Sequence, residues 1–372
     1  MENGYLPLSV HSTAPGELYS GADLMPVPTA LRNIKKQIKK VPSGVAGLWL
    51  KLKKKAKHLE FDTLDRFAAL NRGHGWDGKI TESYLAATEV APSAGKAERL
   101  IDEGMRDWNT NDLLPNRRSL GDVLHDPNIS IEDLDAYLVA DSGINDIQAG
   151  KSTIVDKEAA LSLRESLRTD KAMKPYKDAV NAVRQFNKDL IDYMYAAGLV
   201  TKQQATELHG TRDTLTLDRV VTSIGEANIS RTALEDMAAA LGLKPDAKMS
   251  YRDALNKWRD ENPGVYKSPL NQLLFSTMMA VRSAHINKAK KEIAREWGVT
   301  PENFSKDKDV SFMKGSSVPL QKVEWREYGK KKTAWVDPEI YASMSQLDAS
   351  SRAISSFIIK WVLDKPASLL RA

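Results

Sequence analysis

Apolar residues recur at helical spacing along most of the chain. The two longest runs cover 156–197 and 268–297, and shorter runs cover 62–70, 80–90, 96–108 and 131–139. Pro175 predicts a break inside the first long run, and Gly143, Gly198 and Gly298 predict helix ends. This pattern predicts a mainly α protein with a multi-helix, bundle-like architecture.

Helix-start signals support the same assignment. Ser130 with Asp133 and Thr201 with Gln204 have the spacing of capping residues, and Ser268-Pro269 forms a cap followed by a first-turn proline. Residues 196–205 therefore read as a helix end, a tight turn and a second helix. A DNA-reading helix could use Lys202 and Gln203 at its start, but most such turns only reverse the chain inside a bundle, and we favour that interpretation.

One region has the pattern of β structure, near 318–336. β-branched and aromatic residues, among them Val323, Trp325 and Trp335, lie on both sides of Gly329. They predict a β-hairpin with its turn at Gly329-Lys330 and with Lys330, Lys331 and Lys332 at the tip. Asp337-Pro338 then predicts the start of a final helix.

These elements suggest three parts: an extended N-terminal arm at 1–60 with a basic amphipathic segment, a short-helix domain at 61–150, and a long-helix domain with the hairpin at 151–372. The chain stops at Leu369-Leu370-Arg371-Ala372 without a polar tail. We therefore expect it to be part of a longer chain.

Charge is concentrated in the arm. The 372 residues carry a formal charge of +5, yet ten basic residues and no acidic one lie between Leu24 and Leu59. Without those ten, 44 basic residues face 49 acidic ones. The predicted contact residues of this segment are Arg32, Lys35, Lys36, Lys39, Lys40, Trp49, Lys51, Lys53, Lys54, Lys55 and Lys57.

Three interpretations of the basic segment remain open. Ile34, Ile38 and Val41 form an apolar stripe, which suits surface helices that dock on the body and expose their lysines. Ten cations without acids also suit nonspecific binding of phosphate groups. Trp49 and Leu50 beside lysines resemble a helix at a membrane surface.

Several chemistries are excluded or unsupported. The chain contains no Cys, so disulfides, thiolate metal sites and cysteine nucleophiles are ruled out. Gly150-Lys151-Ser152-Thr153 lacks the earlier glycine of a phosphate-binding loop, and the six His residues are scattered singly. His285 lies on or beside an apolar helix face, where a packed, hydrogen-bonded histidine is expected. We predict no catalytic, cofactor or metal residues, no secretion signal, no membrane-spanning helix and no enzyme activity.

Three stretches carry a family resemblance. They are 61–70 (FDTLDRFAAL), 188–201 (KDLIDYMYAAGLVT) and 328–339 (YGKKKTAWVDPE). In this order they resemble the helical region of the large polyvalent proteins, or internal virion (ejection) proteins, of tailed bacteriophages. The last stretch is similar to a family hairpin whose second strand ends in a Val-Asp-Pro step into a helix.

The resemblance implies a structural module for genome delivery, which could form part of a conduit across the host envelope. It implies other virion or ejection proteins and further copies of the chain as partners, with DNA and a peripheral membrane surface as further contacts. The expected location is the virion interior, and after delivery the host envelope or cytoplasm. The alternative is a nonspecific nucleic-acid-binding protein that uses 32–57 and is injected together with the genome to protect it.

Overall fold

A computed structural model describes residues 25–38, 81–90, 92–148, 155–211, 268–304, 310–311, 318–342 and 344. Of the residues that can be interpreted, 67% are helical, which confirms the prediction of a mainly α fold with a β-hairpin. The helices are α1 (Val27–Gln37), α3 (Glu82–Thr88), α4 (Ser93–Asp102), α5 (Leu120–Leu124), α6 (Ile131–Gln148), α7 (Lys157–Thr169), the short 3-10 helix η1 (Lys171–Met173), α8 (Lys174–Ala196), α9 (Lys202–Thr211) and α13 (Pro269–Trp297). The strands are β1 (Val310–Ser311), β2 (Val318–Pro319), β3 (Gln321–Glu327) and β4 (Lys330–Val336).

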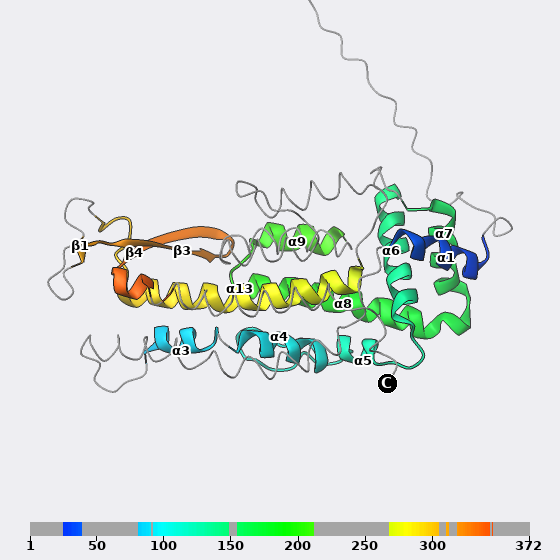
Figure 1. Cartoon of the computed structure of the whole chain (residues 1–372), viewed down its shortest axis with the longest axis horizontal. Coiled ribbons are helices and arrows are strands. Elements are labelled where there is room, and N and C mark those ends of the chain that lie inside the picture. The colour runs from blue at the N-terminus through cyan, green and yellow to red at the C-terminus, as the bar shows by residue number, and fades with distance from the viewer. Residues whose placement is uncertain are drawn as a thin grey trace, which may run out of the picture.

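Helix α13 is the element around which the others are arranged. It lies along the long axis of the molecule, with α3 and α4 on one side and the β3–β4 hairpin on the other (Figure 1). The hairpin lies toward one end of the molecule, and α1, α6 and α7 lie together at the other end. It contacts α3, α4, α6, α8 and both hairpin strands. A single helix of 29 residues therefore runs from the hairpin to α6.

The buried apolar residues form two clusters. The larger core joins α1, α4 to α9 and the first part of α13, as far as Ala284. The smaller core joins α3, the second part of α13 from Ile286, the hairpin, and residues Ile340 and Met344. The larger core contains residues from both sides of position 150 and Ala30 and Ile34 from the arm. The division into three parts stays a prediction.

Local signals place several helix ends correctly. Helix α13 begins at Pro269 and ends at Trp297, as expected. Gly198 has a φ of 76°, the left-handed conformation that ends a helix, directly after α8. Thr201 and Gln204 form the predicted reciprocal cap, since each side chain accepts a hydrogen bond from the other residue's backbone N–H.

One helix end in the middle of the chain was predicted wrongly, and one break was predicted correctly. Helix α6 does not stop at Gly143 but continues to Gln148. A Cβ at Gly143 would lie 2.5 Å from the Cγ2 of Val155, so this glycine permits close packing. The break predicted near Lys174-Pro175 is present, because α7 ends at Thr169, Asp170 caps η1, and α8 begins at Lys174 with Pro175 in its first turn.

The helix predicted at 96–108 is also placed differently, because α4 ends at Asp102 and Gly104 follows with a φ of 115°. The helix expected at 62–70, which carries the first stretch of the resemblance, lies outside the described residues.

The hairpin is confirmed, with its turn one residue earlier than predicted. Strands β3 and β4 pair antiparallel, from Gln321 opposite Val336 to Glu327 opposite Lys330. The turn residues are Tyr328 and Gly329, with φ values of 48° and 74°. Two positive φ values are typical of a type I′ turn. Lys330, Lys331 and Lys332 consequently belong to β4, and residues 338–342 are helical after Asp337 caps the N–H of Glu339.

Candidate functional site

The described part of the basic segment is helix α1, which docks on the body. Ala30 and Ile34 are completely buried in the larger core, and Ile38 packs against that core. The side chain of Asn33 donates a hydrogen bond of 3.1 Å to Asp156 at the start of α7. The apolar stripe therefore docks on the body, as expected for surface helices that expose their lysines. Binding of phosphate groups and contact with a membrane surface by this segment stay predictions.

Three of the predicted contact residues lie on α1, and they differ in environment. Lys35 forms an ion pair with Asp133 of α6, so its ammonium group already has a partner inside the molecule. Arg32 and Lys36 are exposed. The remaining predicted contacts lie outside the described residues: Lys39, Lys40, Trp49, Lys51, Lys53, Lys54, Lys55 and Lys57.

A charged cluster that the sequence did not predict joins α3, α4 and α13. It is centred on the Oε2 atom of Glu89, which follows α3 directly. That oxygen lies 3.0 Å from the Nζ of Lys288, 3.2 Å from the Nδ1 of His285 and 3.8 Å from the Nζ of Lys96. We call these four residues the Glu89 cluster.

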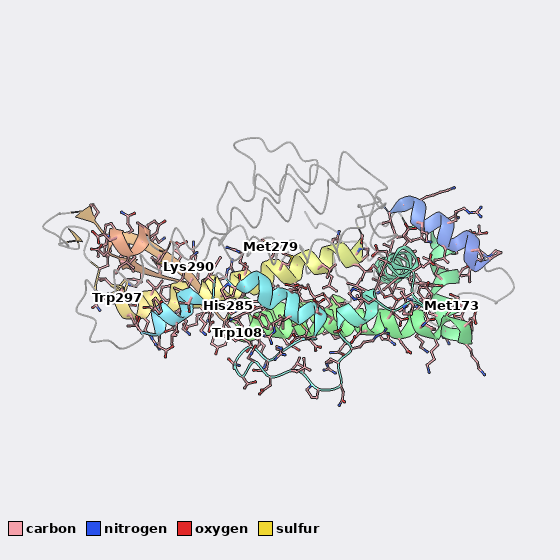
Figure 2. The ribbon with its side chains drawn as sticks, turned by 60° about the horizontal axis from the view of Figure 1, so that its bottom comes forward. Trp108, Met173, Met279, His285, Lys290 and Trp297 are labelled. Carbon is pink, nitrogen blue, oxygen red and sulfur yellow. The ribbon has the colours of Figure 1, made fainter. Side chains whose placement is uncertain are left out.

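Aromatic rings enclose the cluster on one side. The ring of Trp108 lies 5.1 Å from the ring of His285 and 5.1 Å, edge to face, from that of Tyr193. Figure 2 shows Trp108 and His285 midway along the molecule, with Lys290 and Trp297 further along α13. His285 is only 4% exposed, which confirms that it is packed. Its Nδ1 faces Glu89, while its Nε2 has no hydrogen-bond partner among the described residues.

The pKa values in the Glu89 cluster favour ion pairing over proton transfer. His285, then Lys288 and Lys96, lower the pKa of Glu89 to about 2 against the opposing effect of partial burial. Burial lowers the pKa of His285, with Glu89 opposing. At neutral pH the carboxylate is therefore charged and the imidazole is neutral. A carboxylate with so low a pKa is a weak base, so the cluster suits a structural role between helices.

A second polar contact holds the hairpin on α13. Asn287 is 3% exposed, and its side-chain amide donates to the carbonyl of Arg326 at 2.9 Å and to that of Ala197 at 3.3 Å. Its oxygen accepts the N–H of Arg326 at 2.7 Å. One side chain thus pairs with both backbone groups of Arg326 in β3 and also reaches the end of α8.

The hairpin turn and the α8–α9 turn pack directly on each other. The N–H of Gly329 donates to the carbonyl of Gly198 at 2.9 Å. A Cβ at Gly329 would lie 2.5 Å from the backbone nitrogen of Thr201, and one at Gly198 would lie 3.3 Å from that of Tyr328. Both glycines are needed for positive φ and for close approach.

Sequence reasoning missed the partners in these contacts, although it noted some of the residues. Glu89 and Lys288 are separated by 199 positions, and Asn287 and Arg326 by 39. No spacing rule connects residues so far apart. The one sign of these contacts in the sequence was that His285, Asn287 and Lys288 interrupt an apolar helix face.

Within the part of the chain that the structure describes, no group of three or more His, Asp or Glu residues is arranged to hold a metal ion. In the same ranges, no helix combines the length and the apolar character needed to cross a membrane. No family model matches the chain, and no match is found among curated proteins or among solved structures.

Proposed function

We propose that this chain is a structural, non-enzymatic module for genome delivery by a tailed bacteriophage, as an internal virion or ejection protein. Its partners are other virion or ejection proteins and further copies of itself, and it contributes to a conduit across the host envelope. It resides inside the virion and, after delivery, in the host envelope or cytoplasm. The proposal starts from the resemblance of three stretches of the sequence to this class of protein.

One structural observation carries the proposal. Two of the three resembling stretches, 188–201 and 328–339, come together through the contact between Gly198 and Gly329. They are far apart in the sequence, yet their turns form one packed unit. Because the two turns pack on each other, each stretch depends on the other for its packing. This gives a physical reason for both stretches to occur together in one kind of helical scaffold.

The polar interior also supports a scaffold role. The Glu89 cluster ties α3 and α4 to α13, and Asn287 ties the hairpin and α8 to the same helix. The carboxylate of Glu89 is engaged by the ammonium groups of Lys288 and Lys96, and the side-chain amide of Asn287 by the backbone of Arg326 and Ala197. Contacts between elements of this kind suit a structural role.

The assembly state tests this proposal. Native mass spectrometry and negative-stain imaging of the full chain, alone and with DNA or liposomes that contain anionic lipid, should show a discrete oligomer with ring or tube symmetry. A protein that remains a monomer under all of these conditions would contradict the conduit role.

A second candidate function is nonspecific nucleic-acid binding through 32–57. The exposure of Arg32 and Lys36 on docked α1 favours it, since these cations face solvent. Replacement of Lys51, Lys53, Lys54, Lys55 and Lys57 with Glu should then abolish most DNA binding, and wild-type binding should weaken steeply with salt. If the variant bound DNA and anionic vesicles as the wild type does, this candidate would be rejected.

A further inference from the structure

A basic and aromatic surface forms where the hairpin turn meets the start of α9. Its members are Lys202, Tyr328 and Lys330, which we call the hairpin-turn surface. All three are exposed, with Tyr328 at 60%. The contacts of Gly329 with Gly198 and Thr201 bring the two elements together, and the hairpin turn lies beside the start of α9 (Figure 1).

The hairpin carries an excess of positive charge. Residues 321–336 include five basic side chains and two acidic ones. Glu324 pairs with both Lys322 and Lys331 at 2.6 Å, and Glu327 pairs with Lys291 of α13 at 3.2 Å. Both carboxylates of the hairpin are therefore engaged. None of the ion pairs among the described residues uses Lys202 or Lys330.

Tyr328 is an unusual residue for its backbone conformation. Its φ of 48° is left-handed, and the first position of a type I′ turn is strongly preferred by Asn, Asp or Gly. Its ring lies 6.0 Å from that of Tyr195, and the residue is 60% exposed. Strain of this kind persists where a side chain has a role that the preferred residue would not fill. Here the additional feature that Tyr supplies is an exposed aromatic ring.

We propose that the hairpin-turn surface binds single-stranded nucleic acid, with lysines on the phosphates and Tyr328 stacked on an unpaired base. Cations that follow a backbone beside an aromatic ring are the features that sequence-tolerant single-strand binding uses. A membrane surface fits less well, because three apolar side chains of the hairpin are buried: Val323 and Val336 in the smaller core, and Ala334 beside them in β4. The site is preformed, since Asn287 and Gly198 hold the hairpin in place.

This inference does not depend on the proposed function. It concerns a surface on the folded body, separate from the arm at 32–57. It holds equally for a virion scaffold and for a protein that acts alone.

Two variants of the full chain test the surface. Tyr328→Asn removes the ring and installs a residue that suits positive φ, so the fold should be at least as stable while binding is lost. Lys202→Ala with Lys330→Ala removes one cation from each element. Lys174→Ala with Lys177→Ala is the matched control, because both lysines are exposed, and Lys174 starts α8 as Lys202 starts α9.

Binding of a fluorescent mixed-sequence oligonucleotide, single-stranded or duplex, is measured against salt by anisotropy. We expect tighter binding of the single strand, and about tenfold weaker binding for Tyr328→Asn. The double lysine variant should lower the slope of log affinity against log salt by about one unit or more. The control variant should bind as the wild type does.

The same measurements are repeated in a protein that also carries the five Lys→Glu changes in the arm described above. This separates binding by the arm from binding by the hairpin-turn surface, and the effects of the Tyr328 and lysine variants should persist. The inference is overturned if Tyr328→Asn binds as the wild type does, or if the double lysine variant behaves like its control. It is also overturned if the wild type binds anionic vesicles but no oligonucleotide.

Discussion

The carboxylate of Asp135 lies at the first turn of α13, although the residue itself belongs to α6. It is 7% exposed, and its Oδ1 accepts a hydrogen bond of 3.1 Å from the N–H of Leu270. Burial raises the pKa of Asp135 to about 6, even though hydrogen bonds from Ser268 and Leu270 act in the opposite direction. The residue therefore links two helices while its charged form is held in an unfavourable environment.

Asp135→Asn should remove a pH dependence of stability. In the wild type the unfolded carboxyl ionises near its ordinary pKa of 3.8, whereas the folded one ionises near about 6. Between these values the folded state binds more protons, so the free energy of unfolding falls as the pH rises, by up to about 3 kcal/mol. Asn cannot ionise but can still accept from Leu270. Urea titrations from about pH 4 to about pH 7 should show the variant gaining stability relative to wild type as the pH rises.

Glu132→Gln controls for the change in net charge, because Glu132 is an exposed acid on the same helix. If the difference in stability between Asp135→Asn and the wild type did not change with pH, the carboxyl of Asp135 would have the same pKa in the folded and the unfolded state, and this prediction would be wrong. At the scale of single residues, the sequence does not predict contacts such as that of Asp135 with Leu270. Asp135 and Leu270 are separated by 135 positions, and a carboxylate on a helix gives no sign of whether it will be buried or solvated.

At the scale of elements, the paired turns at Gly198 and Gly329 show what local sequence can and cannot predict. The helix end at Gly198, the cap at Thr201 and Gln204, the hairpin and the Val-Asp-Pro step depend on neighbouring residues, and all were predicted. The end predicted for α6 was wrong because Gly143 is explained by its close packing against Val155, which lies on the next segment, and not by a helix end. The mutual contact of the two turns depends on the whole fold, and the sequence did not indicate it.

Gly329→Ala should separate these turns. The new Cβ would meet the backbone of Thr201 at 2.5 Å, and Ala would also have to adopt a φ of 74°. We expect a loss of at least about 2 kcal/mol in the free energy of unfolding. Gly210→Ala in α9 is the control, since nothing lies within 4 Å of a Cβ there, and it should be neutral or stabilising by up to about 1 kcal/mol. Equal effects of the two substitutions in urea titrations would show that the turns do not support each other.

At the scale of the whole molecule, two apolar cores share one helix, and polar contacts lie where they meet. The larger core ends on α13 at Ala284 and the smaller one begins at Ile286, while His285, Asn287 and Lys288 lie at this boundary. Apolar packing alone does not continue from one core into the other. The hydrogen bonds of Asn287 and the ion pairs of Glu89 therefore have a large share in joining them.

Asn287→Ala should weaken that junction and leave the larger core intact. It removes the partners of the Arg326 N–H and carbonyl and of the Ala197 carbonyl, and leaving such groups unpaired when buried costs about 2 kcal/mol or more. Hydrogen exchange followed by mass spectrometry should show faster exchange in β3 and β4, with α6 to α8 unchanged.

Asn187→Ala provides the matched comparison, because Asn187 is a 6% exposed Asn on α8 whose Oδ1 accepts no hydrogen bond among the described residues. Its loss should alter exchange in the larger core and spare the hairpin. If Asn287→Ala accelerated exchange equally in α6 to α8, the two cores would unfold as one cooperative unit. The continuous backbone of α13 would then be sufficient to couple them, and the polar boundary would serve only to satisfy its own buried groups.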